Sequence, residues 1–380
     1  MSILHNLYSD HGQSPWLDNL RREWIRNGEL ARWVERGVRG LTSNPSIFQK
    51  AMTAGHDYDE QFAGLLSDGL SVVDAYWELV LTDIGGALDA LTPVHEASDG
   101  VDGFVSVEVD PKLAHNTDGT LAAARALSQR IDRPNLYVKI PGTAEGLAAI
   151  EAMTAEGRSV NVTLLFSLTR YADVVEAYLC GLEACEGDLS SVSGVASFFI
   201  SRTDTEVDRR LEAIGTPEAL ALRGQAAVAQ GQVAYQIFKR KFSGPRWEAL
   251  AVRGARVQRP LWASTSTKNP AYPDTLYVDQ LIGPDTVNTL PDATLEAFTD
   301  HGTLARTIDA HPDAARAVLD GVTDAGVDLE AVADRLEDEG VSAFVKSFDD
   351  LLESLTTTAD RLTQGAGAEP GGSDQMQGAR

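Results

Sequence analysis

Short apolar runs alternate along this chain with longer stretches in which apolar residues recur at helical spacing. The runs fit strands of a parallel sheet, because such strands are covered on both faces and read as nearly continuous apolar segments. They lie at residues 16–20, 37–44, 103–109, 135–141, 159–166, 194–201, 259–265 and 286–291. Between them, residues 119–131, 144–157 and 169–185 show the pattern of amphipathic helices. The alternation predicts β-α-β units.

Eight strands joined by helical crossovers predict an α/β fold, the (β/α)8 TIM barrel. No glycine-rich dinucleotide turn precedes the third strand, so a nicotinamide-binding sheet is disfavoured. Two crossovers, 45–102 and 202–258, are long enough for helical insertions packed outside the barrel. We expect one catalytic domain over residues 1–364 and a disordered tail over 365–380, where no apolar periodicity remains.

The composition restricts the kinds of partner. The 380 residues carry 56 acidic and 32 basic side chains, a formal net charge of −24. This field repels polyanions, so we expect no nucleic-acid and no membrane partner, and a small anionic substrate would need a local basic pocket. No apolar stretch reaches membrane-spanning length and no signal-like start is present, which predicts a cytoplasmic protein. We expect a monomer or a homodimer. The two cysteines are spaced five apart on a predicted helix, so no metal site is expected.

Lys139 stands in the middle of the apolar run N-L-Y-V-K-I-P-G. Burying an unpaired ammonium group costs several kcal/mol, roughly, so desolvation favours the neutral amine. A neutral amine attacks carbonyl groups and forms Schiff bases. Cleavage of a carbon–carbon bond next to that imine requires a nearby carboxylate to accept a proton. Lys139 is therefore a candidate nucleophile, with a tolerated structural lysine as the alternative.

Two acids lie inside the predicted strands, which is uncommon unless they are paired or catalytic. Asp18 occurs in W-L-D-N-L and Glu108 in V-S-V-E-V-D. An ion pair with Lys139 explains one of them equally well, but it explains both less well.

Further polar residues end the predicted strands, where barrel enzymes place their reacting groups. Asn161 and Thr163 are two apart and share one face of a strand. The loop after the seventh strand is rich in hydroxyls, and such loops often bind phosphate in barrels. Each residue alone is equally explained as a strand-end cap or a solvated loop residue. The additional candidates are Asn44, Ser201, Arg202, Ser264, Ser266 and Lys268.

Five ordered segments resemble one known family. They are G-L-T-S-N-P-S-I-F, V-S-V-E-V-D-P, Y-V-K-I-P-G-T, N-V-T-L-L-F-S and A-S-F-F-I-S-R. They are similar to segments of transaldolases, in the longer bacterial subgroup that also carries W-L-D-N-L, and the similarity runs from about residue 12 to the end of the barrel.

The resemblance implies a transferase of the non-oxidative pentose phosphate pathway. Lys139 would form a Schiff base with sedoheptulose 7-phosphate or fructose 6-phosphate and pass a dihydroxyacetone unit to glyceraldehyde 3-phosphate or erythrose 4-phosphate. Asp18 would be the general base, and Glu108 and Thr163 would hold a catalytic water. No metal or organic cofactor would be required.

The resemblance also implies the binding residues. Asn44 and Asn161 would contact the dihydroxyacetone unit, and Ser201 would supply a hydroxyl contact. Shorter members carry an arginine soon after the serine of strand seven, where this chain reads S-T-S-T-K. We therefore expect Lys268 to bind the phosphate, with help from three neighbours: Ser264, Ser266 and Arg202.

Two alternatives stay open. A class I aldolase would use the same lysine and release free dihydroxyacetone. A barrel without catalysis would bind sugar phosphates only, although keeping acids around a buried lysine makes such a site costly to fold.

Overall fold

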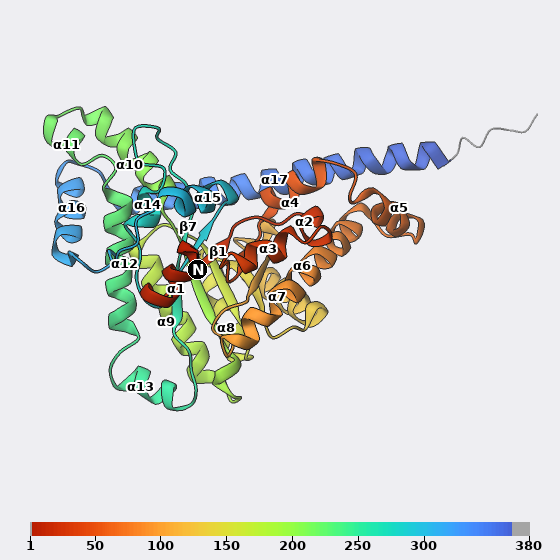
Figure 1. The fold of residues 1–380 in the computed structure, drawn as a ribbon, viewed down its shortest axis with the longest axis horizontal. Helices are drawn as coiled ribbons and strands as arrows, with labels where there is room; N and C mark the ends of the chain where they lie inside the picture. Colours follow the sequence, from red (N-terminus) through yellow and green to blue (C-terminus); the bar gives the residue numbers. More distant parts are fainter. Residues whose placement is uncertain (1, 367–380) are drawn as a thin grey trace, which may run out of the picture.

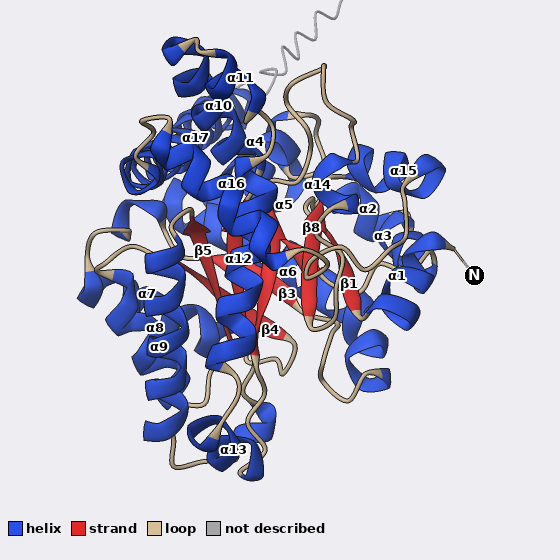
Figure 2. Cartoon of the chain, turned by 90° about the vertical axis from the view of Figure 1, so that its left-hand side faces the viewer, coloured by secondary structure: helices blue, strands red, loops and turns tan. Residues whose placement is uncertain are grey.

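Eight parallel strands close into a barrel in the computed structural model, which describes residues 2–366 (Figures 1 and 2). Each strand pairs with its neighbour in chain order, and the first pairs with the last. The prediction of a (β/α)8 barrel is thus confirmed. The strands are β1 (Gln13–Leu17), β2 (Leu41–Thr42), β3 (Val105–Glu108), β4 (Leu136–Pro141), β5 (Val160–Leu165), β6 (Gly194–Phe199), β7 (Gln258–Ala263) and β8 (Thr286–Leu290).

The first strand differs from its prediction. β1 begins at Gln13 and ends at Leu17, so Asp18 follows the strand instead of lying within it. Its opening residues are polar or proline, which is why the apolar pattern missed them. Two of their polar atoms are hydrogen-bonded inside the protein, since Gln13 Nε2 donates to Leu281 O at 2.7 Å and Ser14 Oγ donates to Asp102 Oδ2 at 2.7 Å.

Side chains alternate between two cores along every strand. In β4, Val138 and Ile140 belong to the core between the barrel and its helices, whereas Tyr137 belongs to the core inside the barrel. Trp16 fills much of the barrel interior, where a Cβ on Gly40 would lie 2.4 Å from its ring. Lys139 has the same parity as Tyr137, so the pleat turns it inward.

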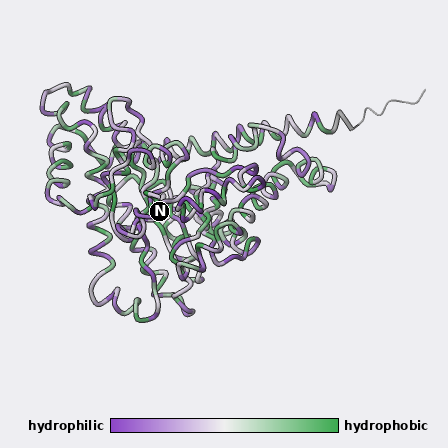
Figure 3. The backbone as a smooth tube through the Cα atoms, viewed as in Figure 1, coloured by the Kyte–Doolittle hydropathy of each residue, from purple (hydrophilic) through white to green (hydrophobic). Residues whose placement is uncertain are grey.

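Helices surround the barrel on all sides (Figure 2). Figure 3 shows hydrophobic and hydrophilic positions alternating along these helices, as expected for elements with one buried face. Within residues 2–366 no helix is both long and apolar enough to cross a membrane. Outside the two long crossovers, the α-helices are α1 (Ile3–His11), α2 (Arg22–Arg26), α3 (Glu29–Glu35), α7 (Thr117–Ile131), α8 (Gly146–Ala155), α9 (Leu168–Ala184), α14 (Leu276–Asp279), α15 (Asp292–His301) and α16 (Pro312–Asp324).

The two long crossovers are helical. The first, between β2 and β3, holds α4 (Pro45–Thr53), α5 (Asp59–Ser67) and α6 (Val72–Ala97). The second, between β6 and β7, holds α10 (Ser201–Ile214), α11 (Pro217–Ala221), α12 (Ala226–Lys241) and α13 (Pro245–Val252). Short 3-10 turns occur at η1 (Pro111–Leu113) and η2 (Leu189–Ser191).

A long final helix, α17 (Leu329–Ala366), crosses one end of the barrel and extends beyond α5 (Figure 1). Polar contacts tie it to several elements. Ser347 and Ser46 have hydroxyls 2.7 Å apart, and Ser167 Oγ donates to Glu330 Oε2 at 2.7 Å. The predicted tail over 365–380 lies, from residue 367 onward, outside the described residues.

Candidate active site

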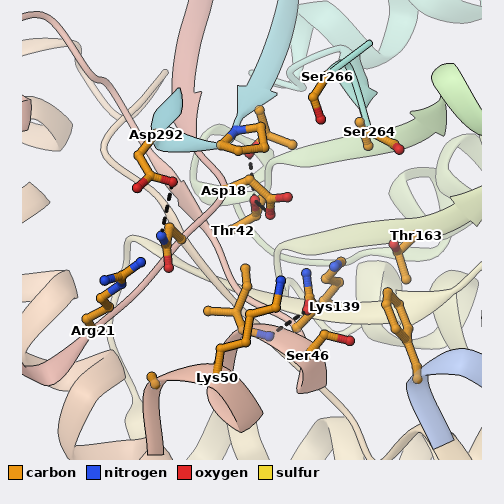
Figure 4. Close-up of a pocket in the computed structure, with 18 of the residues that line it drawn as sticks. Asp18, Arg21, Thr42, Ser46, Lys50, Lys139, Thr163, Ser264, Ser266 and Asp292 are labelled. Atoms are coloured by element: carbon orange, nitrogen blue, oxygen red, sulfur yellow. Dashed lines mark hydrogen bonds between the residues drawn. The ribbon is translucent and has the colours of Figure 1, made fainter. Parts of the chain in front are cut away.

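A cavity of about 550 Å³ opens at the carboxyl-terminal end of the barrel (Figure 4). This is the end at which barrel enzymes carry their active sites. Most of the predicted site residues line it: Asp18, Asn44, Lys139, Thr163, Arg202, Ser264, Ser266 and Lys268. Residues far apart in the sequence are therefore brought to one chamber.

Lys139 forms an ion pair at the base of this cavity. Its side chain is buried, and Nζ lies 3.1 Å from Glu108 Oε2 and 3.3 Å from Ser43 O, to which it donates. The pairing of β3 with β4 sets Glu108 directly beside Lys139. Burial raises the pKa of Glu108, although Lys139 opposes the shift, so this carboxyl holds a proton more readily than an exposed one. The pair can therefore exchange protons with a bound group.

Glu108 itself is 5% exposed and does not line the cavity. Within residues 2–366, Glu108 Oε2 contacts Lys139 Nζ while its Oε1 has no partner, and Thr163 Oγ1 is likewise buried without a partner. Buried polar atoms without partners are rare in folded proteins. These oxygens are the ones that the sequence assigned to a catalytic water.

Asp18 stands at the rim of the barrel. Its backbone N–H donates to Leu290 O at 2.8 Å, and its Oδ1 accepts from Thr42 Oγ1 at 2.7 Å. The hydroxyls of Thr42 and Thr289 lie 2.6 Å apart, which fixes the Thr42 rotor. Burial raises the pKa of Asp18, while Lys139 and the bond from Thr42 work against that rise. A carboxylate with a raised pKa is a better proton acceptor than an ordinary one.

The two predicted asparagines have different surroundings. Asn44 lines the cavity and caps α4, accepting from Ile47 N at 3.0 Å. Asn161 is buried and does not reach the wall. It donates to Ser106 Oγ at 3.0 Å and accepts from Ser197 Oγ at 2.7 Å. Ser197 does line the cavity, so Asn161 orients a hydroxyl of the cavity wall through this hydrogen bond.

Ser201 lies beside the cavity and not on its wall. The sixth strand ends at Phe199, and Ser201 already begins α10. Its hydroxyl lies 3.0 Å from that of Ser264. Ser197, two positions before Phe199 and of the same parity, is the serine of this strand that lines the cavity.

Four cations line the cavity without a carboxylate partner among the described residues, namely Arg21 and the three considered next. Lys50, Arg202 and Lys268 form no ion pair with any residue of the described part of the chain; Lys268 Nζ only donates to Ser266 Oγ at 3.1 Å. Burial lowers the pKa of Lys268, and the positive charges of Arg202 and Lys50 lower it further. In Figure 4, Lys50 reaches from α4 toward the middle of the cavity. The arrangement suits a bound anion.

Comparisons with known proteins identify the family of this chain. A family model described as Transaldolase/Fructose-6-phosphate aldolase matches residues 15–355. The transaldolase of Thermobifida fusca (strain YX) is 54% identical over 352 residues, 91% of this chain and 96% of that protein. The transaldolase of Parafrankia sp. (strain EAN1pec) is 53% identical over 349 residues, 90% and 95%. The transaldolase of Mycobacterium leprae (strain Br4923) is 49% identical over 359 residues, 93% and 96%.

The chain belongs to the transaldolase/fructose-6-phosphate aldolase family. The resemblance seen in the sequence is thereby confirmed, as is the expectation of an enzyme of the transferase class. Metal-binding clusters of three or more His, Cys, Asp or Glu side chains do not occur among residues 2–366.

Sequence reasoning missed several residues that this family member places around the cavity. They are Thr42, Lys50, Ser197 and Phe344. Ser197 could have been found from the alternation of side chains along β6, because it lies on the same face of the strand as Phe199. Phe344 comes from α17, and its ring centroid lies 5.7 Å from Lys139 Nζ. No local sequence pattern predicts that contact, because it depends on where α17 crosses the barrel.

Proposed function

We propose that this chain is a transaldolase that carries a three-carbon dihydroxyacetone unit on Lys139. The donor would be sedoheptulose 7-phosphate or fructose 6-phosphate, and the acceptor glyceraldehyde 3-phosphate or erythrose 4-phosphate. One observation carries the proposal: a buried lysine amine faces the cavity beside one acid, Glu108, while a second acid, Asp18, stands on the cavity wall. Both carboxyls have pKa values raised by burial.

The first step joins substrate and enzyme. The neutral amine of Lys139 attacks the C2 carbonyl of the ketose phosphate, and the resulting carbinolamine loses water to give a protonated imine. Glu108 and Thr163 would move the protons of this step through a bound water, which the unpartnered Glu108 Oε1 and Thr163 Oγ1 suit. Thr163 also lines the cavity.

The second step breaks the bond between C3 and C4. Asp18 would take the C4 hydroxyl proton as the bonding electrons move toward the imine nitrogen, and the aldose phosphate leaves. The acceptor aldehyde is then attacked by C3 of the enamine, and Asp18 returns its proton to the new hydroxyl. Water finally hydrolyses the imine, which frees the product and restores Lys139.

Binding of the three-carbon unit falls to polar groups near Lys139. Asn44 and Ser197 line the cavity, and Asn161 orients Ser197 through its 2.7 Å hydrogen bond. In this proposal Ser197 takes the hydroxyl contact that the sequence assigned to Ser201.

The phosphate would bind among the unpaired cations of the cavity. Arg202 comes from the first turn of α10, Lys268 from the segment that follows β7, and Lys50 from α4. Ser264 and Ser266 provide hydroxyl donors on the same wall. In a chain of net charge −24, unpaired cations gathered in one cavity favour an anionic substrate.

The ceiling of the cavity favours transfer over release. Phe344 lies over Lys139 and is itself buried, so it limits the water that reaches the amine. An enamine sheltered from water survives until an acceptor aldehyde arrives. An enzyme releasing free dihydroxyacetone would instead need that water.

The test is to trap the imine. The protein is incubated with fructose 6-phosphate, reduced with borohydride and digested for peptide mass spectrometry. We expect a three-carbon adduct on the peptide containing Lys139, absent from Lys139→Met and retained in the control Lys346→Met, whose lysine is exposed. An adduct on another lysine, or none when substrate binding is shown separately, would overturn the proposal.

A second arm separates transfer from release. Products are analysed with and without erythrose 4-phosphate. We expect sedoheptulose 7-phosphate with the acceptor and little free dihydroxyacetone without it. Steady formation of free dihydroxyacetone at a similar rate in both cases would instead identify an aldolase.

A further inference from the structure

Two buried carboxylates on α10 play no part in the chemistry proposed above. The helix opens with S-R-T-D-T-E-V-D, in which Arg202 lines the cavity while Asp204 and Asp208 do not. Asp204 is 1% exposed and Asp208 is 7% exposed. They stand four residues apart, and therefore on one face of the helix.

Each carboxylate binds one tyrosine and one backbone amide. Asp204 Oδ2 accepts from the Tyr277 hydroxyl at 2.9 Å, and its Oδ1 accepts from Ala227 N at 2.7 Å. Asp208 Oδ2 accepts from the Tyr272 hydroxyl at 2.7 Å. Its Oδ1 accepts from the N–H of residue 224 at 2.9 Å. The two sites thus repeat the same design one helical turn apart.

Both tyrosines belong to the segment that follows β7. Residues 264–275, here named the β7 loop, carry Ser264, Ser266 and Lys268, and Tyr272 lies in the loop while Tyr277 lies just after it in α14. The loop leaves the strand through a left-handed residue, since φ of Ser264 is 55°. That conformation is unfavourable for a serine, so contacts elsewhere must hold the loop in place.

Joining a helix to a loop through buried carboxylates lowers the stability of the fold. Neither forms an ion pair with a described residue, and a buried charge without a cation is destabilising. Apolar side chains would pack the same surfaces at lower cost. What hydrogen-bonded carboxylates add is direction, because each bond fixes where its tyrosine hydroxyl lies.

That direction matters because the loop and the helix each bring a cation to one place. Lys268 comes from the β7 loop and Arg202 from α10, and neither has a carboxylate partner among residues 2–366. Like charges held together repel, and the positive charge of Arg202 is one of the influences that lower the pKa of Lys268. Without an anchor, the free energy is lowered when the loop moves away from Arg202.

We propose that Asp204 and Asp208 are positioning residues that hold the β7 loop against α10, so that Lys268 and Arg202 stand ready for one phosphate group. The inference rests on the proposed function, because it takes the anion of the cavity to be the substrate phosphate. Holding the cations in place before binding removes part of the ordering cost of binding.

The test removes only the tyrosine hydroxyls. Tyr272→Phe, Tyr277→Phe and the double variant are assayed with fructose 6-phosphate and with unphosphorylated fructose as donor. We expect KM for fructose 6-phosphate to rise about 3-fold in each single variant and about 10-fold in the double variant, with kcat nearly unchanged. The kcat/KM for fructose should stay the same.

The matched control is Tyr178→Phe, which removes another tyrosine hydroxyl bond, 2.9 Å to Arg256 O, far from the β7 loop. It should lose stability like the loop variants but keep the KM for fructose 6-phosphate. Asp204→Asn supplies a second variant, because its amide oxygen can still accept from Tyr277 although its NH2 group then faces the N–H of Ala227 and that bond is lost. It should retain a KM closer to that of the unmodified enzyme than the double tyrosine variant does.

Lys268→Gln separates the two proposals. If it leaves the preference for fructose 6-phosphate over fructose unchanged, the phosphate assignment of the proposed function fails. If it removes that preference while the folded double tyrosine variant keeps a normal KM and a normal inhibition constant for inorganic phosphate, the positioning role is overturned and the phosphate assignment stands.

Discussion

The two ends of this barrel treat buried carboxylates in opposite ways. At the amino-terminal end, Asp102 is fully buried and accepts bonds from two arginines, at 2.8 Å from Arg39 Nε and 2.9 Å from Arg259 Nη2. Ser14 and Trp16 donate as well. Burial alone would raise its pKa, but Arg259 and Arg39 outweigh burial and hold the pKa below its ordinary value.

At the carboxyl-terminal end, Glu108 has one cation beside its Oε2, Lys139, and its Oε1 has no partner among residues 2–366. The cations of that end are equally short of partners. The comparison teaches that the fold can satisfy a buried charge completely where nothing else is required. At the cavity it leaves charged groups without partners, so that these groups are free to interact with a bound substrate.

The largest expected effect breaks the chemistry at the cavity end. Asp18→Asn should lower kcat by about 10²- to 10⁴-fold, the usual loss for a general base, because an amide cannot accept the C4 hydroxyl proton. The melting temperature should be unchanged or higher, since the amide still accepts from Thr42 and no buried charge remains. Steady-state kinetics and thermal unfolding check this. A kcat within 3-fold of the unmodified enzyme, roughly, would remove Asp18 from the mechanism.

The matching change at the other end should affect stability instead. Asp102→Asn leaves Arg39 and Arg259 without their counter-charge, so the free energy of unfolding should fall by about 3 to 5 kcal/mol. Denaturant unfolding measures the loss. At low temperature the folded fraction should keep its kcat. A large loss of kcat without loss of stability would show that the amino-terminal end contributes to catalysis and would erase the contrast.

A third experiment uses pH. Burial raises the pKa of Asp204 to about 6 from 3.8, so the folded chain binds this proton more tightly than the unfolded chain does. Its contribution to stability is complete below pH 3.8 and lost as pH rises through 6. Relative to the unmodified protein, Asp204→Asn should therefore gain up to about 3 kcal/mol between pH 4 and 6. A difference that stays constant over this range would contradict the shift.

The smallest expected effect concerns Lys50, a cation of the cavity wall. Lys50→Gln should raise KM for fructose 6-phosphate about 2- to 5-fold, because an exposed ammonium contributes at most about 1 kcal/mol to an ion pair. The KM for unphosphorylated fructose should not change. Lys346→Gln, an exposed lysine on α17, is the control. An equal change in KM for both sugars would place Lys50 outside the phosphate site.

The barrel and its central residues were predictable from the sequence because both follow from local rules. Apolar runs reveal parallel strands, and the period of two turns Lys139 and Thr163 inward at the end where barrels place their sites. The differences also have physical causes. The sequence placed Ser201 at the end of a strand because the apolar run continues past Phe199, where the strand has already given way to α10. Lys50 and Phe344 lie on helices whose docking depends on distant packing, which no window of sequence contains.

The crossing of α17 over the barrel has a consequence for the order in which the protein is made. The last barrel strand ends at Leu290, whereas the helix that supplies Phe344 begins at Leu329. A chain emerging from the ribosome therefore carries Lys139 and both acids before it carries the ring that covers the lysine. Phe344 can cover the amine only once α17 has been made and has docked, so the chamber is completed after all eight strands have been made.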